Sequence, residues 1–139
     1  MITLHEQKAL SSHEVRQKSP IELAFVGDAV YELLVRETIC LEHDVPAGKL
    51  HRMSVSYVCA AAQQQALESI GPLLTEEEQD YVRRGRNANK VTSAKNADPA
   101  DYRAATALEC LFGYLYLTGQ MERIQTLFQC ILENRTESN

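Results

Sequence analysis

The chain has 139 residues, of which 45% are hydrophobic, and it carries a formal net charge of −5 at pH 7. This length predicts one domain, residues 1–139, built around a single hydrophobic core at about 19–134 with polar tails. No apolar run is long enough to span a membrane and no secretory leader is present, so we expect a cytoplasmic protein without a membrane partner.

Capping boxes, prolines and glycines predict an all-α fold with no β-strand. The predicted helices run from Pro20 to about Thr38, from Pro46 to Gly71, from Thr75 into the following segment, from Asp98 to Gly119, and from about Met121 to Glu133. The four cysteines, Cys40, Cys59, Cys110 and Cys130, form no C-x-x-C pair. Their apolar surroundings predict buried, reduced thiols rather than disulfides or zinc ligands.

Two acidic residues stand in otherwise apolar helical segments. Asp28 lies in the run Leu23-Ala24-Phe25-Val26-Gly27-Asp28-Ala29-Val30-Tyr31, and Glu109 is the only charge between Ala104 and Leu117. An ionised carboxylate that faces a core is costly unless a partner compensates it. Two interpretations are open. In the first, both acids bind one divalent cation. In the second, each acid forms a salt bridge with an arginine, and Arg36 and Arg103 are both nearby in sequence.

Gly27 and Gly113 lie close to these acids inside the predicted helices. A glycine within a helix costs about 1 kcal/mol relative to alanine, and the close approach of two helix backbones would explain its presence. We therefore expect the two helices to cross and to bring Asp28 and Glu109 together. Magnesium suits such a pair, because it is commonly held by one or two carboxylates with substrate phosphates and water.

The segment between Tyr81 and Ala97 contains five basic residues and no acidic one. The rest of the chain carries nine basic against nineteen acidic residues, so the basic segment indicates a nucleic-acid surface rather than a merely solvated loop. Without Phe or Trp it is better suited to the phosphates and ribose hydroxyls of a duplex than to stacked single-stranded bases. The candidate RNA contacts are Arg83, Arg84, Arg86, Asn87, Lys90, Lys95 and Asn96.

Three motifs resemble the ribonuclease III domain, and the Mini-ribonuclease III subfamily in particular. The first runs from Ala24 to Leu33 around Gly27-Asp28, and the second runs from Ala107 to Leu117 around Glu109. The third comprises Arg83-Arg84-Gly85-Arg86-Asn87-Ala88, Lys95-Asn96-Ala97-Asp98 and Tyr102-Arg103. The resemblance covers about Pro20 to Phe128, and we see no room for a separate double-stranded-RNA-binding domain, which is itself a mark of the subfamily.

The resemblance implies a homodimeric, magnesium-dependent endoribonuclease that cleaves double-stranded RNA, with Mn²⁺ as a substitute ion. The implied substrate is the precursor of 23S ribosomal RNA, with a large-subunit ribosomal protein as a further partner that presents the RNA. Asp28 and Glu109 would be both the metal ligands and the catalytic residues. Glu32, one turn after Asp28, is interpreted either as a contact to metal-bound water or as a member of a structural salt bridge.

Ribonuclease III proteins usually carry two further acids, at the positions of Ala24 and Thr106 in this chain. The Mini subfamily tends to share this reduction, which predicts a metal held weakly until RNA phosphates complete its ligand shell. The alternative function is a non-catalytic double-stranded-RNA-binding scaffold in ribosome assembly. The presence of both Asp28 and Glu109 argues against it.

Overall fold

The computed structural model describes residues 8–88 and 98–138, with the side chains of 136–138 left out. Over these ranges the chain forms helices and no β-strand, so the all-α prediction is confirmed. None of these helices is long and apolar enough to cross a bilayer. The elements are α1 (Ser12–Arg16), α2 (Pro20–Glu42), α3 (Ala47–Val58), α4 (Ala60–Ile70), the 3-10 helix η1 (Gly71–Leu73), α5 (Glu76–Arg86), α6 (Pro99–Leu117) and α7 (Met121–Ser138).

The predicted helix starts are formed by the predicted capping groups. Ser19 and Glu22 bond each other's backbone N–H groups at 3.1 and 2.9 Å, and Thr75 and Glu78 do the same at the start of α5. Asp98 caps α6 by accepting from the N–H of Ala100 at 2.7 Å. Each cap satisfies backbone donors that the first turn of a helix leaves without partners.

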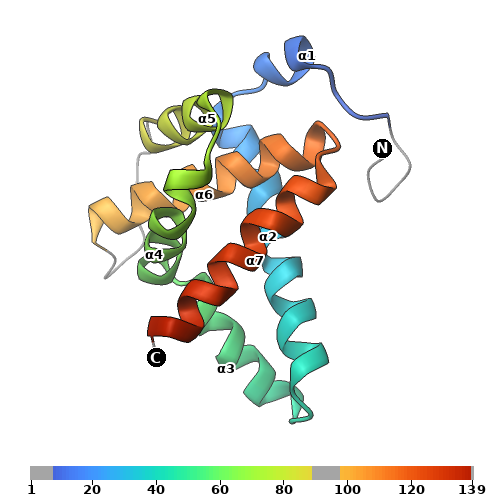
Figure 1. Ribbon diagram of the computed structural model, residues 1–139, viewed down its shortest axis with the longest axis vertical. Helices are drawn as coiled ribbons and strands as arrows, with labels where there is room; N and C mark the ends of the chain where they lie inside the picture. Colours follow the sequence, from blue (N-terminus) through green and yellow to red (C-terminus); the bar gives the residue numbers. More distant parts are fainter. Residues whose placement is uncertain (1–7, 89–97, 139) are drawn as a thin grey trace.

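Helix α6 is the central element, and α2, α4 and α5 pack around it while α7 covers the lower side (Figure 1). The buried centre of α6 includes Leu108, Leu111, Phe112 and Leu115, all fully buried. The rings of Phe112 and Tyr31 of α2 meet edge to face, with centroids 5.3 Å apart. This core fixes how α2 crosses α6, which is the crossing that positions the acidic residues.

The two predicted glycines lie where α2 and α6 cross. A Cβ atom on Gly27 would overlap the carbonyl oxygen of Glu109, and one on Gly113 would overlap the carbonyl oxygen of Leu23. Neither overlap can be relieved by turning a side chain, because both obstructing atoms are backbone. The expectation that two helix backbones approach closely at these glycines is therefore confirmed.

The second predicted helix is divided into α3 and α4. Cys59 has φ −63° and ψ 158°, which is extended backbone, and ends α3 at Val58. The side-chain amide of Gln63 donates to the carbonyl of Val58 at 2.9 Å, so a carbonyl at the end of α3 is satisfied by a side chain. The continuous apolar pattern gave no sign of this break, because it continues on both sides of Cys59.

The N-terminal segment packs more closely than a polar tail would. Val15 of α1 is fully buried, and the N–H of Leu10 donates to the carbonyl of Leu117 at 2.8 Å. Arg16 bonds Asp80 of α5 at 2.7 Å. These few anchoring contacts are spread over a short segment, which has too few apolar residues to show a helical period.

The four cysteines are free thiols, as predicted, but their burial differs from the prediction. Cys110 is buried and Cys130 is half-buried, whereas Cys40 and Cys59 are exposed. Cys40 lies on the outer side of α2, and Cys59 lies in the break between α3 and α4. The prediction that the last two are buried was wrong, because apolar neighbours in sequence do not show which side of a helix the described part of the chain covers.

Candidate active site

Asp28 lies at the α2–α6 crossing with its side chain exposed to solvent. It lines a surface hollow of about 630 Å³ together with Phe25, Glu32 and Leu33. The premise of a carboxylate facing the core is therefore wrong for this residue. Gly27 takes the position nearest α6, and the next residue on a helix is turned about 100° away from it.

Glu109 is half-buried on α6, and its backbone carbonyl packs against Gly27. Because Gly27 is the residue before Asp28, the two acids come from adjacent positions at one helix crossing. The carboxylate of Glu109 also contacts α4, where Nε2 of Gln63 lies 3.4 Å from its Oε2. Gln63 is a site neighbour that the sequence did not single out, since it lies in an ordinary run of three glutamines.

The pairing of Asp28 with Arg36 is not formed. Nε of Arg36 lies 3.5 Å from Oε2 of Glu32, an i,i+4 ion pair along α2. Asp28 has no ion-pair partner in the part of the chain that the structure describes. The salt-bridge interpretation thus applies to Glu32, while Asp28 remains available to a ligand.

The donor atoms around the crossing are oxygens, which suit Mg²⁺ or Mn²⁺ better than a softer metal. Oε2 of Glu32, which Arg36 approaches at 3.5 Å, and Oε1 of Gln63 are buried without a hydrogen-bond partner among the described residues. No group of three or more His, Cys, Asp or Glu side chains that could hold a metal occurs within residues 8–88 and 98–138. The chemistry of these residues fits a divalent cation that also needs water or substrate phosphate to complete its shell.

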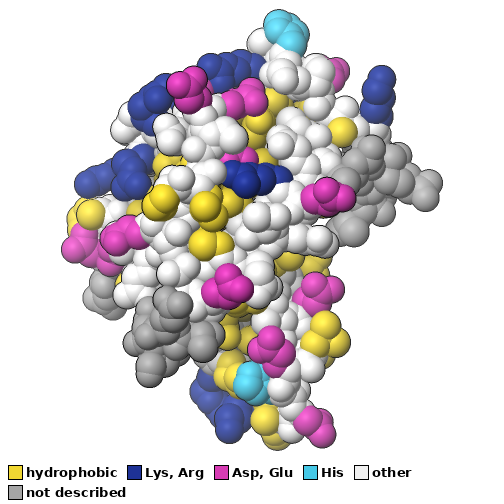
Figure 2. All heavy atoms as spheres, in the orientation of Figure 1, with side chains coloured by type: hydrophobic (Ala, Val, Ile, Leu, Met, Phe, Trp, Pro, Cys, Tyr) yellow, Lys and Arg dark blue, Asp and Glu magenta, His cyan; other side chains and the backbone are white. Residues whose placement is uncertain are grey.

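Four of the candidate RNA contacts lie at the C-terminal end of α5, where Lys and Arg side chains gather on the surface (Figure 2). Gly85 fixes this end against α6, because a Cβ there would lie 2.7 Å from Cβ of Cys110 and 2.8 Å from Cα of Ala107. Cys110 follows Glu109, so the basic end of α5 packs beside the acidic residue of α6. Lys90, Lys95 and Asn96 lie outside the described residues.

The arginines of this end differ in their surroundings. Arg83 is exposed and paired with Asp80, which also bonds Arg16 at 2.7 Å. The hydrogen bond from Arg16 holds the pKa of Asp80 below its usual value. Arg86 and Asn87 are exposed, and Arg86 makes no ion pair in the described ranges.

Arg84 is half-buried and packs against the protein itself. Its guanidinium lies 5.1 Å from the ring centroid of Tyr81, and its Nη2 donates to the carbonyl of Lys18 at 3.2 Å. Its Nη1 is buried and has no hydrogen-bond partner within residues 8–88 and 98–138. Arg84 therefore has a structural function that the charge pattern alone did not reveal.

Cysteine chemistry is not supported at this site. Burial raises the pKa of the Cys110 thiol to about 12, so the thiol stays protonated at neutral pH and is a poor nucleophile. A nucleophilic function of this thiol is therefore not indicated.

Known proteins with the same helices and motifs decide the family. The ribonuclease III domain family matches residues 21–120. The chain belongs to the ribonuclease III family. It is 50% identical over 110 residues to the Mini-ribonuclease 3 of Symbiobacterium thermophilum, covering 79% of this chain and 85% of that protein. It is 43% identical over 126 residues to that of a Thermoanaerobacter species, covering 91% of this chain and 89% of that protein.

The three-dimensional comparison agrees with the sequence relatives. A crystal structure of a Fusobacterium nucleatum protein superposes with a TM-score of 0.79 at 29% identity, covering 87% of this chain and 97% of that one. The resemblance to Mini-ribonuclease III read from the sequence is confirmed, and the chain is a ribonuclease III-type endoribonuclease.

The two positions at which this ribonuclease III domain lacks the family's further acids are both buried. Ala24 is 4% exposed, and Thr106 is also 4% exposed with its hydroxyl donating to the carbonyl of Tyr102 at 3.1 Å. Neither side chain has a carboxylate to offer a metal. Among the described residues, Asp28 and Glu109 remain the candidate carboxylates at this crossing, and Glu32 pairs with Arg36.

Proposed function

We propose that this endoribonuclease cleaves double-stranded RNA in a Mg²⁺-dependent reaction, with Asp28 and Glu109 as metal ligands and catalytic residues. The observation that carries the proposal is the α2–α6 crossing, where the backbone of Glu109 packs against the residue before Asp28. The basic end of α5 packs through Gly85 against Thr106, Ala107 and Cys110, the residues that flank Glu109 on α6. An acidic pair beside a basic surface is the arrangement that hydrolysis of a polyanion requires.

The two acidic residues would have distinct roles in the reaction. Asp28 and Glu109 supply anionic oxygens, and a magnesium ion bound by them would activate a water and neutralise charge on the scissile phosphate. Mn²⁺ offers the same coordination chemistry and is the expected substitute. Glu109, half-buried and contacted by Gln63, is the more constrained ligand, while exposed Asp28 meets the substrate side.

The basic segment would hold the RNA backbone. Arg83 and Arg86 of the described residues are exposed at the end of α5 and would contact phosphates, as would Lys90 and Lys95. Asn87 and Asn96 carry amides that could bond ribose 2′-hydroxyls and so distinguish RNA from DNA. Arg84 would act on the substrate mainly by fixing the end of α5, because its guanidinium is already engaged.

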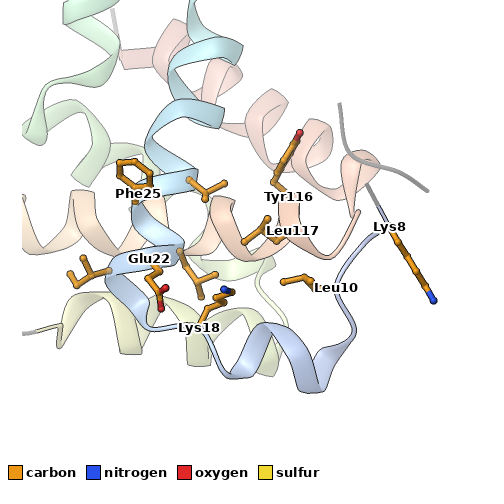
Figure 3. Close-up of a pocket in the computed structure, with 10 residues that line it drawn as sticks. Lys8, Leu10, Lys18, Glu22, Phe25, Tyr116 and Leu117 are labelled. Atoms are coloured by element: carbon orange, nitrogen blue, oxygen red, sulfur yellow. The ribbon is translucent and has the colours of Figure 1, made fainter. Parts of the chain in front are cut away.

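A homodimer would supply two such sites, one for each strand of a duplex. Ribonuclease III enzymes are typically dimeric, and α2 carries an uncovered apolar face. Phe25 is 83% exposed and Leu33 is 53% exposed. Phe25 stands between two hollows, one of them about 550 Å³ and lined also by Leu10 and Leu117 (Figure 3). A second copy of this chain would cover these side chains.

The biological substrate we propose is the precursor of 23S ribosomal RNA in the cytoplasm, with a large-subunit ribosomal protein presenting it. The support is the family membership, through relatives named Mini-ribonuclease 3 that match most of the chain. Footprinting of the cuts on authentic precursor RNA, with and without ribosomal proteins, tests this assignment.

The reaction itself is tested with a perfect RNA duplex incubated with the protein in Mg²⁺ or in EDTA. We expect endonucleolytic products only with Mg²⁺ or Mn²⁺, and none from the matching DNA duplex. Binding of the duplex without cleavage under any metal would instead support the scaffold function and contradict the proposal.

A further inference from the structure

Gln63 is a buried polar residue at the first turn of α4, and it joins two structural elements. Its side chain is 3% exposed. Nε2 donates to the carbonyl of Val58 at 2.9 Å and lies 3.4 Å from Oε2 of Glu109. One amide nitrogen therefore connects the end of α3 with the acidic residue of α6.

The other half of the same amide has no partner. Oε1 of Gln63 is buried without a hydrogen bond among the described residues. A buried carbonyl oxygen without a donor is unfavourable, whereas a methionine or leucine would fill similar space without that cost. The position thus carries a polar group that packing alone does not require.

We infer that Gln63 is a positioning residue for the metal ligand Glu109, an inference that rests on the proposed function. An amide N–H₂ can only donate, so it pairs with a carboxylate oxygen and restricts the rotation of the carboxylate. Side chains that orient metal ligands in this way typically contribute 10–100-fold to metal affinity or activity. Oε1 of the same amide would be free to accept a hydrogen bond from a water when a cation is bound.

The break between α3 and α4 gives Gln63 its reach. Extended backbone at Cys59 ends α3, so that α4 begins in a new direction with Gln63 in its first turn. The bond to Val58 then fixes the side chain from the opposite side. A merely structural role would involve this bond alone, whereas positioning of the ligand involves the contact with Glu109.

The test compares Gln63→Met, which keeps length and volume but has no N–H group, with Gln65→Met as a matched control. Gln65 is exposed and lies in the same run of glutamines. Mn²⁺ affinity is measured by electron paramagnetic resonance of the free ion, alongside thermal unfolding and the Mg²⁺ dependence of single-turnover cleavage. We expect about tenfold or greater weakening of Mn²⁺ binding and a higher Mg²⁺ requirement in Gln63→Met only.

Unchanged Mn²⁺ affinity in Gln63→Met, with or without lower thermal stability, would leave Gln63 a structural residue and overturn the inference. If Gln63→Met fails to fold, Gln63→Asn is tested in its place. It keeps a buried amide, but its side chain is too short to reach both the carbonyl of Val58 and the carboxylate of Glu109. Its Mn²⁺ affinity should fall likewise, and an unchanged value again overturns the inference. Failure of the proposed function is separate, since wild type would then cleave without metal or Glu109→Gln would remain active.

Discussion

Gly27 packs against the backbone carbonyl of Glu109 so closely that a Cβ atom on Gly27 would overlap the carbonyl oxygen. Together with the packing of Gly113 against the carbonyl oxygen of Leu23, this contact determines how near α2 lies to α6. It also places the backbone at Asp28, the next residue of α2, close to that of Glu109, which we propose as its partner ligand. The stability of the fold and the geometry of the acidic site therefore depend on the same glycine.

Gly27→Ala should separate the two helices and destabilise the protein. We expect the free energy of unfolding to fall by about 1–3 kcal/mol or more, as for other overpacked cores, and cleavage to fall with it. Urea unfolding measures the first effect. Gly71→Ala is the control, because no described residue beyond its chain neighbours lies within 4 Å of a Cβ there, and it should leave stability equal or higher.

Arg86→Ala and Arg84→Ala should differ. Arg86 is exposed, so its loss should leave stability unchanged and weaken the binding of unrelated RNA duplexes equally. The slope of log affinity against log salt concentration should become less steep by about one per subunit. Arg84→Ala should weaken binding and also lower stability, by about 1 kcal/mol, because its contacts with Tyr81 and Lys18 are lost. Salt titrations of RNA binding in the Asp28→Asn background, with urea unfolding, test both.

Phe25→Asp should prevent the proposed dimer from forming and leave a monomer of about 15.6 kDa. A charge on the exposed apolar face of α2 cannot be buried against a second copy without a large penalty. Leu41→Asp is the matched control, because Leu41 is also on α2 and 80% exposed but lies at the opposite end. Light scattering at micromolar concentration measures the mass, and a monomeric wild type with full duplex cleavage would contradict the dimer.

Arg123→Met should lower stability at neutral pH and change its dependence on acid. Glu78 is buried, and its Oε2 lies 2.8 Å from Nε of Arg123. Burial raises the pKa of the Glu78 carboxyl, but the bonds from Arg123 and Thr75 outweigh it and hold the pKa below the ordinary 4.5. A carboxyl group whose pKa is lower in the folded state stabilises the fold at pH values above its pKa in the unfolded state. This stabilisation is lost as the pH falls through the folded pKa.

The free energy of unfolding of the variant should therefore be lower by about 3 kcal/mol at pH 7, because Glu78 stays buried without its arginine partner. Its stability should then fall less steeply than that of wild type below about pH 4.5. Urea unfolding at a series of pH values checks the sign. Equal slopes for the two proteins below that pH would show that this pair does not contribute to acid sensitivity.

Local signals in the sequence predicted the helix starts and the close crossing. Ser19 with Glu22 forms a cap from residues three apart, so its geometry is already encoded within one turn. Gly27 was informative for a different reason, since a glycine inside a helix is unfavourable unless another backbone lies against it. Both features depend on few atoms, and both are confirmed.

Features that depend on distant partners could not be predicted in this way. Hydrophobic periodicity does not distinguish a core from a face left for another molecule, so Asp28 was expected to face the core although it is exposed. Arg84 was counted only as a charge, although its contacts come from Tyr81 and from Lys18, which is 66 residues away. Gln63 acts through contacts with two other helices.

The central claim is that Asp28 and Glu109 perform the chemistry of RNA cleavage. Single-turnover cleavage of an RNA duplex in Mg²⁺ by Asp28→Asn and Glu109→Gln tests it most directly, with Glu37→Gln, an exposed carboxylate of α2, as control. Each amide is close in size to the acid it replaces. We therefore predict loss of cleavage by both site variants, with fold and RNA affinity retained, and normal cleavage by Glu37→Gln. Near-normal turnover by either site variant would contradict the assignment, and unfolding of either would indicate that its carboxylate has a structural function instead.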